Sequence, residues 1–157
     1  MARVGYLIKR AQTVLHDAMA DALGSHDLTV PQFAVLTGLD EEPGLSNADL
    51  ARRAFVTPQS MHTVLQELER LQFVVRRPHP QHQRVLQAEL TEAGRRTLKS
   101  ANNSVNAVEQ QMLRKLSNPA RSRLASALSS CIDSLAEASA SSGARRPVIR
   151  RNREECA

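Results

Sequence analysis

The chain has 157 residues, of which 41% are hydrophobic and 24% are charged, a composition that suits one globular domain with appendages. Aromatic residues make up only 3%, which argues against a platform that stacks single-stranded bases. The net charge is +5, and 18 of the 21 cations are Arg, whose planar fork suits phosphate and guanine. No apolar stretch approaches the roughly 18 residues of a membrane span, and the N-terminus lacks an apolar signal region. We therefore expect a cytoplasmic protein with a polyanionic partner and no contact with the membrane.

Two helices are predicted at the start of the chain. Apolar residues at helical spacing indicate a helix over residues 4–23, which ends at Gly24. Thr29 and Gln32, three residues apart, form a capping box that opens a second helix. That helix should end before Pro43.

Two more helices follow, each after a capping residue. Ser46 is a suitable N-cap for a short helix over residues 47–53. Thr57 and Pro58 predict a helix over residues 58–70, because Pro is favoured at the first helical position. The apolar stripe of this helix contains Met61, Val64, Leu65 and Leu68.

The apolar period changes after Leu71. Residues 73–75 and 84–90 have the composition and alternation of two strands. The polar link at 78–83 holds two Pro and indicates the tip of a hairpin.

Two long helices are predicted after the hairpin. Thr91 caps the first, which keeps one apolar face to about Ser117. The second starts at Asn118 and Pro119. Its expected inner face contains Leu124, Leu128, Cys131 and Leu135.

This order of elements predicts a mostly α (α+β) fold, a winged helix-turn-helix at residues 28–91 between long flanking helices. The flanking segments, 1–27 and 92–140, carry apolar stripes with no partner domain in the chain. We expect them to bury each other as dimerisation helices across a two-fold axis. Residues 141–157 carry five Arg and two Glu among small polar residues, so we expect a basic flexible tail.

The recognition helix of a helix-turn-helix enters the major groove, where each base pair presents a distinct pattern of donors and acceptors. Here it would be residues 58–70, supported by residues 47–53, with charge from Arg52 and Arg53. The arc opposite its apolar stripe holds Gln59, Ser60, His62, Thr63, Gln66 and Arg70. Taken alone, this arc is more simply explained as an ordinary solvated helix face.

The hairpin adds a second feature. Arg76, Arg77 and Arg84 cluster at its base and tip, and an Arg on a thin β-loop suits the narrow minor groove. A solubilising surface hairpin is the alternative, but both features in sequence favour DNA binding. The candidate DNA-contacting residues are Arg52, Arg53, Thr57, Gln59, Ser60, His62, Thr63, Gln66, Arg70, Arg76, Arg77 and Arg84.

Four segments resemble the multiple-antibiotic-resistance regulator (MarR) family of bacterial transcription factors. They read LTVPQF at 28–33, GLSNADLARR at 44–53, VTPQSM at 56–61 and LTEAG at 90–94, and with the flanking helices the similarity spans about residues 4–138. The resemblance implies a homodimeric repressor that binds a palindromic operator in double-stranded DNA. It also implies release by a small aromatic or phenolic effector bound between the dimer helices and the DNA-binding lobe. Candidate ligand-binding residues are Tyr6, His16, Met19, Phe33 and Phe55.

Three positions depart from the family pattern. His82 stands where the wing commonly has Asp, two residues before Arg84. Thr63 stands where the recognition helix often has Arg, and Phe55 where the turn often has Gly. We expect Phe55 to pack in the core, with the ligand cleft as the alternative.

Other functions have weaker support in the sequence. His79 and His82 could bind a metal together with His62, but these wing residues lack a nearby Cys or carboxylate, so no metal site is expected. Cys131 is expected to be a small buried hydrophobe rather than a redox sensor. The chain has no Gly-rich phosphate loop, Gly-x-Ser-x-Gly or His-Glu-x-x-His, so we expect neither an enzyme nor a cofactor. The alternative function is a non-specific architectural DNA-binding protein or a winged-helix protein-interaction module.

Overall fold

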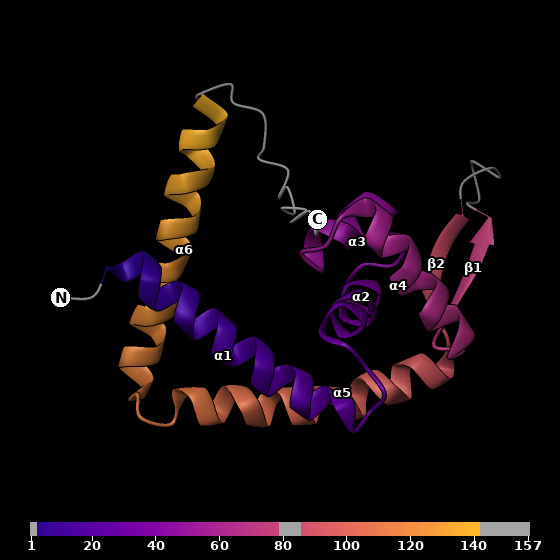
Figure 1. Ribbon diagram of the computed structural model, residues 1–157, viewed down its shortest axis with the longest axis horizontal. Helices are drawn as coiled ribbons and strands as arrows, with labels where there is room; N and C mark the ends of the chain where they lie inside the picture. Colours follow the sequence, from indigo (N-terminus) through magenta and orange to yellow (C-terminus); the bar gives the residue numbers. More distant parts are fainter. Residues whose placement is uncertain (1–2, 79–85, 142–157) are drawn as a thin grey trace, which may run out of the picture. The chain divides into compact units, whose positions relative to one another are not determined.

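The computed structural model describes residues 3–78 and 86–141, and the chain divides into two compact units, residues 1–112 and 113–157. The first unit contains the helices α1 (Val4–Gly24), α2 (Val30–Glu41), α3 (Asn47–Arg53) and α4 (Pro58–Arg70). It continues with the strands β1 (Val74–Pro78) and β2 (Leu86–Leu90) and with α5 (Glu92–Leu113), which ends at the division between the units. The second unit contains α6 (Asn118–Ser141), and the elements are drawn in Figure 1.

The starts of α2, α3 and α4 are fixed by side-chain caps, as the sequence predicts. The Thr29 hydroxyl accepts from the Gln32 amide at 3.4 Å, and the Gln32 side chain accepts from the Thr29 amide at 2.8 Å. The Ser46 and Thr57 hydroxyls cap α3 and α4 by accepting from the amides of Asp49 and Ser60. Each such cap stabilises a helix by about 1 kcal/mol, so short α3 can form before a recognition helix.

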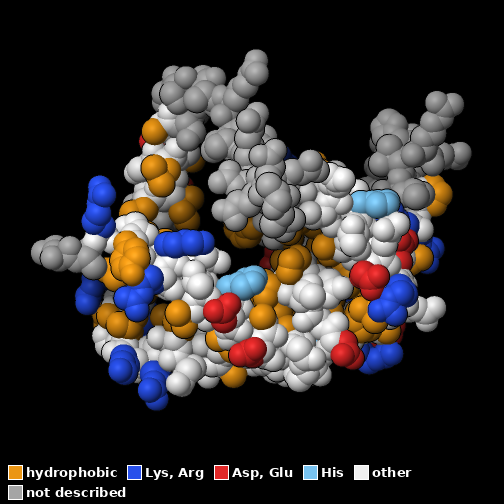
Figure 2. Space-filling model, viewed as in Figure 1, with side chains coloured by type: hydrophobic (Ala, Val, Ile, Leu, Met, Phe, Trp, Pro, Cys, Tyr) orange, Lys and Arg blue, Asp and Glu red, His pale blue; other side chains and the backbone are white. Residues whose placement is uncertain are grey.

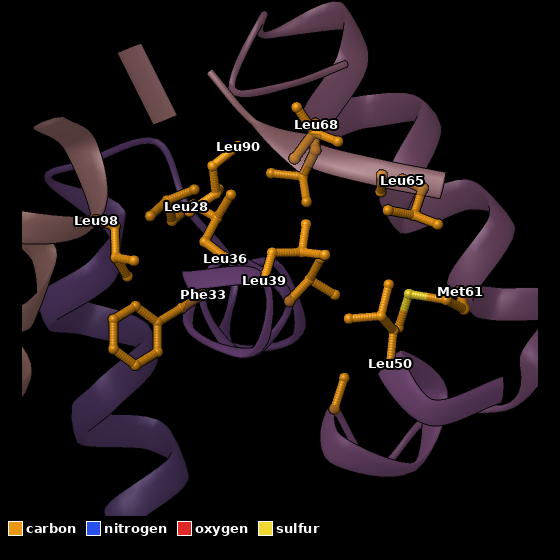
Figure 3. Close-up of a cluster of buried hydrophobic side chains, with 14 of the residues drawn as sticks. Leu28, Phe33, Leu36, Leu39, Leu50, Met61, Leu65, Leu68, Leu90 and Leu98 are labelled. Carbon is orange, nitrogen blue, oxygen red and sulfur yellow. The ribbon is translucent and has the colours of Figure 1, made fainter. Parts of the chain in front are cut away.

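The hydrophobic core lies between α2, α3, α4 and the hairpin, and α1 and α5 each contribute a few side chains to it. Figure 3 shows leucines of α2 and α4 meeting Leu50 of α3 and Leu90 of β2. Burying one such side chain contributes about 1.5–3 kcal/mol. The largest fully buried side chains are Leu23, Val35, Leu36, Leu50, Met61, Leu65 and Leu68.

The hairpin is a two-stranded antiparallel sheet in which Val74 pairs with Leu90. Its first strand extends beyond the predicted residues 73–75, to Pro78. Ala88 and Leu90 are buried and alternate with exposed Glu89, as predicted. The predicted start of the second strand at residues 84–85 lies outside the described residues.

The start of α5 is packed against Phe73, the residue before β1. Thr91 caps α5, accepting from the Gly94 amide at 3.0 Å. A Cβ atom built at Gly94 would lie 2.1 Å from the Phe73 carbonyl oxygen, so no side chain fits at this position. The wing is therefore joined to α5 by backbone contact.

Helix α5 ends at Leu113, four residues before the predicted end at Ser117. The physical reason lies in the second unit, where the Arg121 side chain donates to the carbonyl oxygens of Leu113 and Leu116, both at 3.1 Å. An arginine thus satisfies the carbonyl groups at a helix end, a role that the spacing of apolar residues does not reveal.

Helix α6 starts at Asn118, as predicted, but its expected inner face is exposed in the single chain. Leu124, Leu128 and Leu135 are exposed, and so is Cys131, which the sequence analysis expected to be buried. None of the described helices is long and apolar enough to cross a membrane.

Candidate nucleic-acid interface and adjoining cleft

The helix-turn-helix is formed by α3, a tight turn and α4. Phe55 in the turn has φ +54°, in the left-handed region that favours glycine. Its amide donates to the Arg52 carbonyl at 3.3 Å, and the Val56 amide donates to the Ala51 carbonyl at 3.0 Å. The position where the family often has Gly therefore does need a glycine-like backbone, although Phe occupies it here.

The recognition helix α4 is divided into two faces, as the sequence predicts. Met61, Leu65 and Leu68 are buried. The opposite face is exposed and consists of Gln59, Ser60, His62, Thr63, Gln66 and Arg70. Thr57 lies at the start of this face, and its hydroxyl both caps the helix and donates to the Ser60 hydroxyl at 2.9 Å. These polar groups can donate and accept hydrogen bonds at base edges and phosphates.

The two arginines of α3 are both held by carboxylates. Arg52 pairs with Asp49, one turn earlier. Arg53 pairs with Glu41 at 2.9 Å and with Glu42 at 2.7 Å, at the end of α2. Glu41 and Glu42 therefore have a structural role, because they hold the Arg53 guanidinium. Arg53 joins the supporting helix to α2.

The arginines of α4 and the wing also have acidic neighbours, and Figure 2 shows basic and acidic side chains side by side over this region. Arg70 pairs with Glu67 at 2.9 Å on the exposed face of α4. Arg77 pairs with Glu89 at 3.3 Å across the hairpin, and its side chain remains 67% exposed.

Arg76 differs from Arg77, the next residue of β1, because its side chain is only 18% exposed. Its Nε lies 2.9 Å from Glu69 Oε2, so the pair joins α4 to β1. In this structure Arg76 is placed to hold the wing against the recognition helix. The predicted wing residue Arg84, together with His79 and His82, lies outside the described residues.

The carboxylate of Asp49 is tied to the start of α3. The Ser46 hydroxyl donates to it at 2.5 Å, and Arg52 pairs with it. The hydrogen bond from Ser46, followed by that from Arg52, holds the pKa of Asp49 below its ordinary value. A negative charge here also suits the positive end of the helix dipole.

The wing is anchored to the loop before α3. The Gln87 side chain of β2 donates to the Gly44 carbonyl at 3.0 Å, and Gly44 has φ +88°. The positive φ favours glycine, and a Cβ at Gly44 would lie 3.0 Å from the same Gln87 nitrogen, so a side chain here would displace Gln87. No local pattern in the sequence indicates this role of Gln87, because the contact spans 43 residues.

A cleft of about 990 Å³ opens beside the helix-turn-helix, between α1, α2 and the turn that contains Phe55. Four of the five predicted ligand-binding residues, His16, Met19, Phe33 and Phe55, line it. Tyr6 does not line it and lies instead beside Arg10, whose guanidinium carbon is 5.8 Å from the ring centroid.

The expectation that Phe55 packs in the core is wrong, because its side chain is 95% exposed. The turn geometry directs the ring away from the core and onto the rim of the cleft. Sequence reasoning also missed Gln12, Thr37, Glu41 and Arg53 as lining residues. Gln12 and Thr37 could have been predicted, because each lies one helical turn from a predicted lining residue, His16 or Phe33.

Comparisons with known proteins agree with this geometry. A family model described as "MarR family" matches residues 26–85. The HTH-type transcriptional repressor Rv2887 of Mycobacterium tuberculosis is 42% identical over 118 residues, which cover 75% of this chain and 85% of that protein.

Two crystal structures of the same mycobacterial protein superpose with a TM-score of 0.71 and 39% identity over 83% of this chain. One is its complex with DNA, and the similarity covers 98% of that protein chain. The other is its complex with salicylic acid, where it covers 97% of the protein chain. By its winged helix-turn-helix and by this similarity, the chain belongs to the MarR family of helix-turn-helix transcriptional regulators.

Proposed function

We propose that the protein is a ligand-responsive repressor that binds a palindromic operator in double-stranded DNA as a homodimer. The observation that carries this proposal is the exposed polar face of α4, which stands opposite a fully buried stripe on a capped, well-packed helix. The mycobacterial relative that is named a repressor has been crystallised with DNA, which supports the same role here.

Different residues of this interface are proposed to contact base edges, phosphates and the minor groove. Gln59, Ser60, His62 and Thr63 lie on the first turns of α4 and would read base edges, because the N-terminal part of such a helix enters the groove. Gln66 and Arg70 lie further along, and Arg52 and Arg77 are exposed enough to meet phosphates. Arg84 would enter the minor groove, and Thr57 would position the helix start.

The cleft is proposed to bind the effector. Its walls are mostly apolar and aromatic and lie next to the turn of the helix-turn-helix, so a ligand there can influence α3 and α4. The relative crystallised with salicylic acid suggests a small aromatic carboxylate. His16, Met19, Phe33 and Phe55 would contact its ring.

We also propose which segments of the chain bind DNA and which form the dimer. Residues 28–91 form the DNA-binding lobe, and residues 1–27 and 92–140 form the dimerisation helices. The basic tail expected at residues 141–157 lies, apart from Ser141, outside the described residues. A regulator of operator DNA acts in the cytoplasm and needs neither a cofactor nor catalytic activity. Exposed apolar residues of α1, including Leu7, Ile8 and Val14, support the dimer.

The test is selection of binding sites from a random double-stranded DNA pool, followed by affinity measurement with and without salicylate. We expect an enriched palindrome whose half-sites lie about one helical turn apart, and weaker binding when salicylate is added. If all sequences bind equally, the protein is an architectural DNA-binding protein. If none binds, it is a protein-interaction module.

A further inference from the structure

Arg53 lies where α3, α2 and the cleft meet. It is the last residue of α3, and its guanidinium binds Glu41 and Glu42 at the end of α2. Its aliphatic stem passes over Gly38, where an added Cβ would lie 3.3 Å from the Arg53 Cδ. The side chain is therefore held in place at both its stem and its charged end.

Arg53 is also the one permanent cation among the described residues that line the cleft. The walls beside it are mainly apolar and include the rings of Phe33 and Phe55. A carboxylate that enters such surroundings needs a cationic partner, and the arginine fork can bind it through two parallel hydrogen bonds.

A second polar group points to the same ligand chemistry. Thr37 lies one helical turn before Glu41 and lines the cleft. Its hydroxyl is buried and has no hydrogen-bond partner among the described residues, which is uncommon in folded proteins. A hydroxyl donor in a cleft that also holds a guanidinium is suited to a carboxylate ligand.

We propose that Arg53 is the switch residue of this protein, exchanged between Glu41 and Glu42 in the free protein and the carboxylate of the aromatic effector in the bound protein. This inference rests on the proposed function of the cleft. The two ion pairs tie α3 to α2. When the effector takes over the guanidinium, this link is lost while Leu50 stays packed in the core, so the end of α3 and the turn that positions α4 for DNA can shift.

Calorimetric titration of the full-length protein with sodium salicylate tests the anion site without DNA. Replacing Arg53 by Gln should weaken salicylate binding by about tenfold or more, because a charged hydrogen-bonded partner is lost. Binding of salicylamide, which lacks the charge, should be unchanged by Arg53→Gln. The matched control is Arg52→Gln on the same helix, which should leave salicylate affinity as in the wild type.

Substitution of the two glutamates is expected to tighten salicylate binding, a result that a misfolded variant would not give. The double substitution Glu41→Gln, Glu42→Gln should tighten salicylate binding by about fivefold, because the competitors for Arg53 lose their charge. The same double substitution made in an Arg53→Gln background should bring no gain. A gain of equal size in both backgrounds would mean that the glutamates repel the ligand directly, and it would overturn the exchange.

Salicylate affinity within twofold of the wild type in Arg53→Gln, or no salicylate binding by the wild type, would also overturn the inference. The proposed function fails separately, when the ligand-free wild-type protein selects no DNA sequence. In a protein that does bind an operator, Arg53→Gln should leave operator affinity insensitive to salicylate.

Discussion

The backbone conformation at Phe55 favours glycine, although the residue carries a large aromatic side chain. Its φ of +54° costs a non-glycine residue about 1–2 kcal/mol, while its ring is 95% exposed and adds little burial to the single chain. We expect Phe55→Gly to have a free energy of unfolding about 0.5–1 kcal/mol higher than Phe55→Ala, despite the greater flexibility of glycine in the unfolded chain.

Urea unfolding of the two variants measures this difference. Both variants lack the ring, so the comparison isolates the backbone. An alanine variant as stable as the glycine variant would show that the turn is not strained. Retention of Phe at a strained position fits its place on the rim of the cleft, where the ring can contact an effector.

Asp49 gives the start of α3 a dependence on pH. Its hydrogen bonds with Ser46 and Arg52 lower the pKa of its carboxyl group, so its contribution to stability is fully present above the ordinary aspartate pKa. The contribution is lost as the pH falls through the lowered pKa of the folded protein. We expect the difference in unfolding free energy between the wild type and Asp49→Asn to be constant near neutrality and to shrink below about pH 4.

Chemical denaturation at a series of pH values checks this dependence. A difference between the wild type and Asp49→Asn that persists unchanged into acid would contradict the role of the charged carboxylate.

Between elements, the pair Arg76–Glu69 joins the recognition helix to the wing. Because Arg76 is largely buried in this contact, we expect it to act by positioning the wing rather than by meeting phosphate. Arg76→Gln should lower operator affinity, and Glu69→Gln should lower it by a similar amount. The double variant should lose little more than either single variant, because both remove one interaction.

Operator affinity measured over a salt series separates the two roles. A phosphate contact would lower the salt slope by about one unit on substitution, whereas a positioning residue leaves the slope unchanged. Arg77→Gln serves as the exposed comparison on the same strand. A reduced slope in Arg76→Gln, additive with Glu69→Gln, would place Arg76 on the DNA.

The helix starts could be predicted from the sequence because their signals are local. Thr29, Ser46 and Thr57 each cap a helix within three residues of their own position, and the two faces of α4 follow from its apolar period. The wing was predicted for a similar reason, since its alternation at Ala88 to Leu90 is carried within one strand.

The contacts that span elements could not be predicted in this way. The pairing of Arg53 with Glu41 and Glu42 joins two helices, and nothing in the local pattern marks it. The early end of α5 depends on the side chain of Arg121, which comes after the helix. Phe55 was expected in the core because it is apolar, whereas the turn geometry decides its exposure.

For the whole molecule, the exposed apolar faces of the flanking helices predict a dimer. Leu7, Ile8 and Val14 are exposed on α1, and Leu124, Leu128 and Ile132 are exposed on α6 within its own unit. An interface that buries such faces should exceed about 2,000 Å². We therefore expect light scattering to give the mass of a dimer at low micromolar concentration.

The substitution Leu128→Glu should shift the protein towards monomer, because it puts a charge into the proposed interface. Arg123→Glu, at an exposed polar position of the same helix, is the control for the effect of an added acid. A stable, folded wild-type monomer at low micromolar concentration would rule out this mode of assembly.

The most direct test of the proposed DNA-binding function is the affinity of Gln59→Ala for the selected operator and for random DNA, measured side by side by fluorescence anisotropy. Gln59 is exposed on the first turn of α4 and carries no charge, so its contribution should be hydrogen bonding to a base. We expect Gln59→Ala to lose about 1–3 kcal/mol of binding free energy at the operator, through relaxed preference at one base pair in each half-site, and almost none with random DNA. An equal loss on both DNAs would contradict this expectation and would make Gln59 a backbone contact.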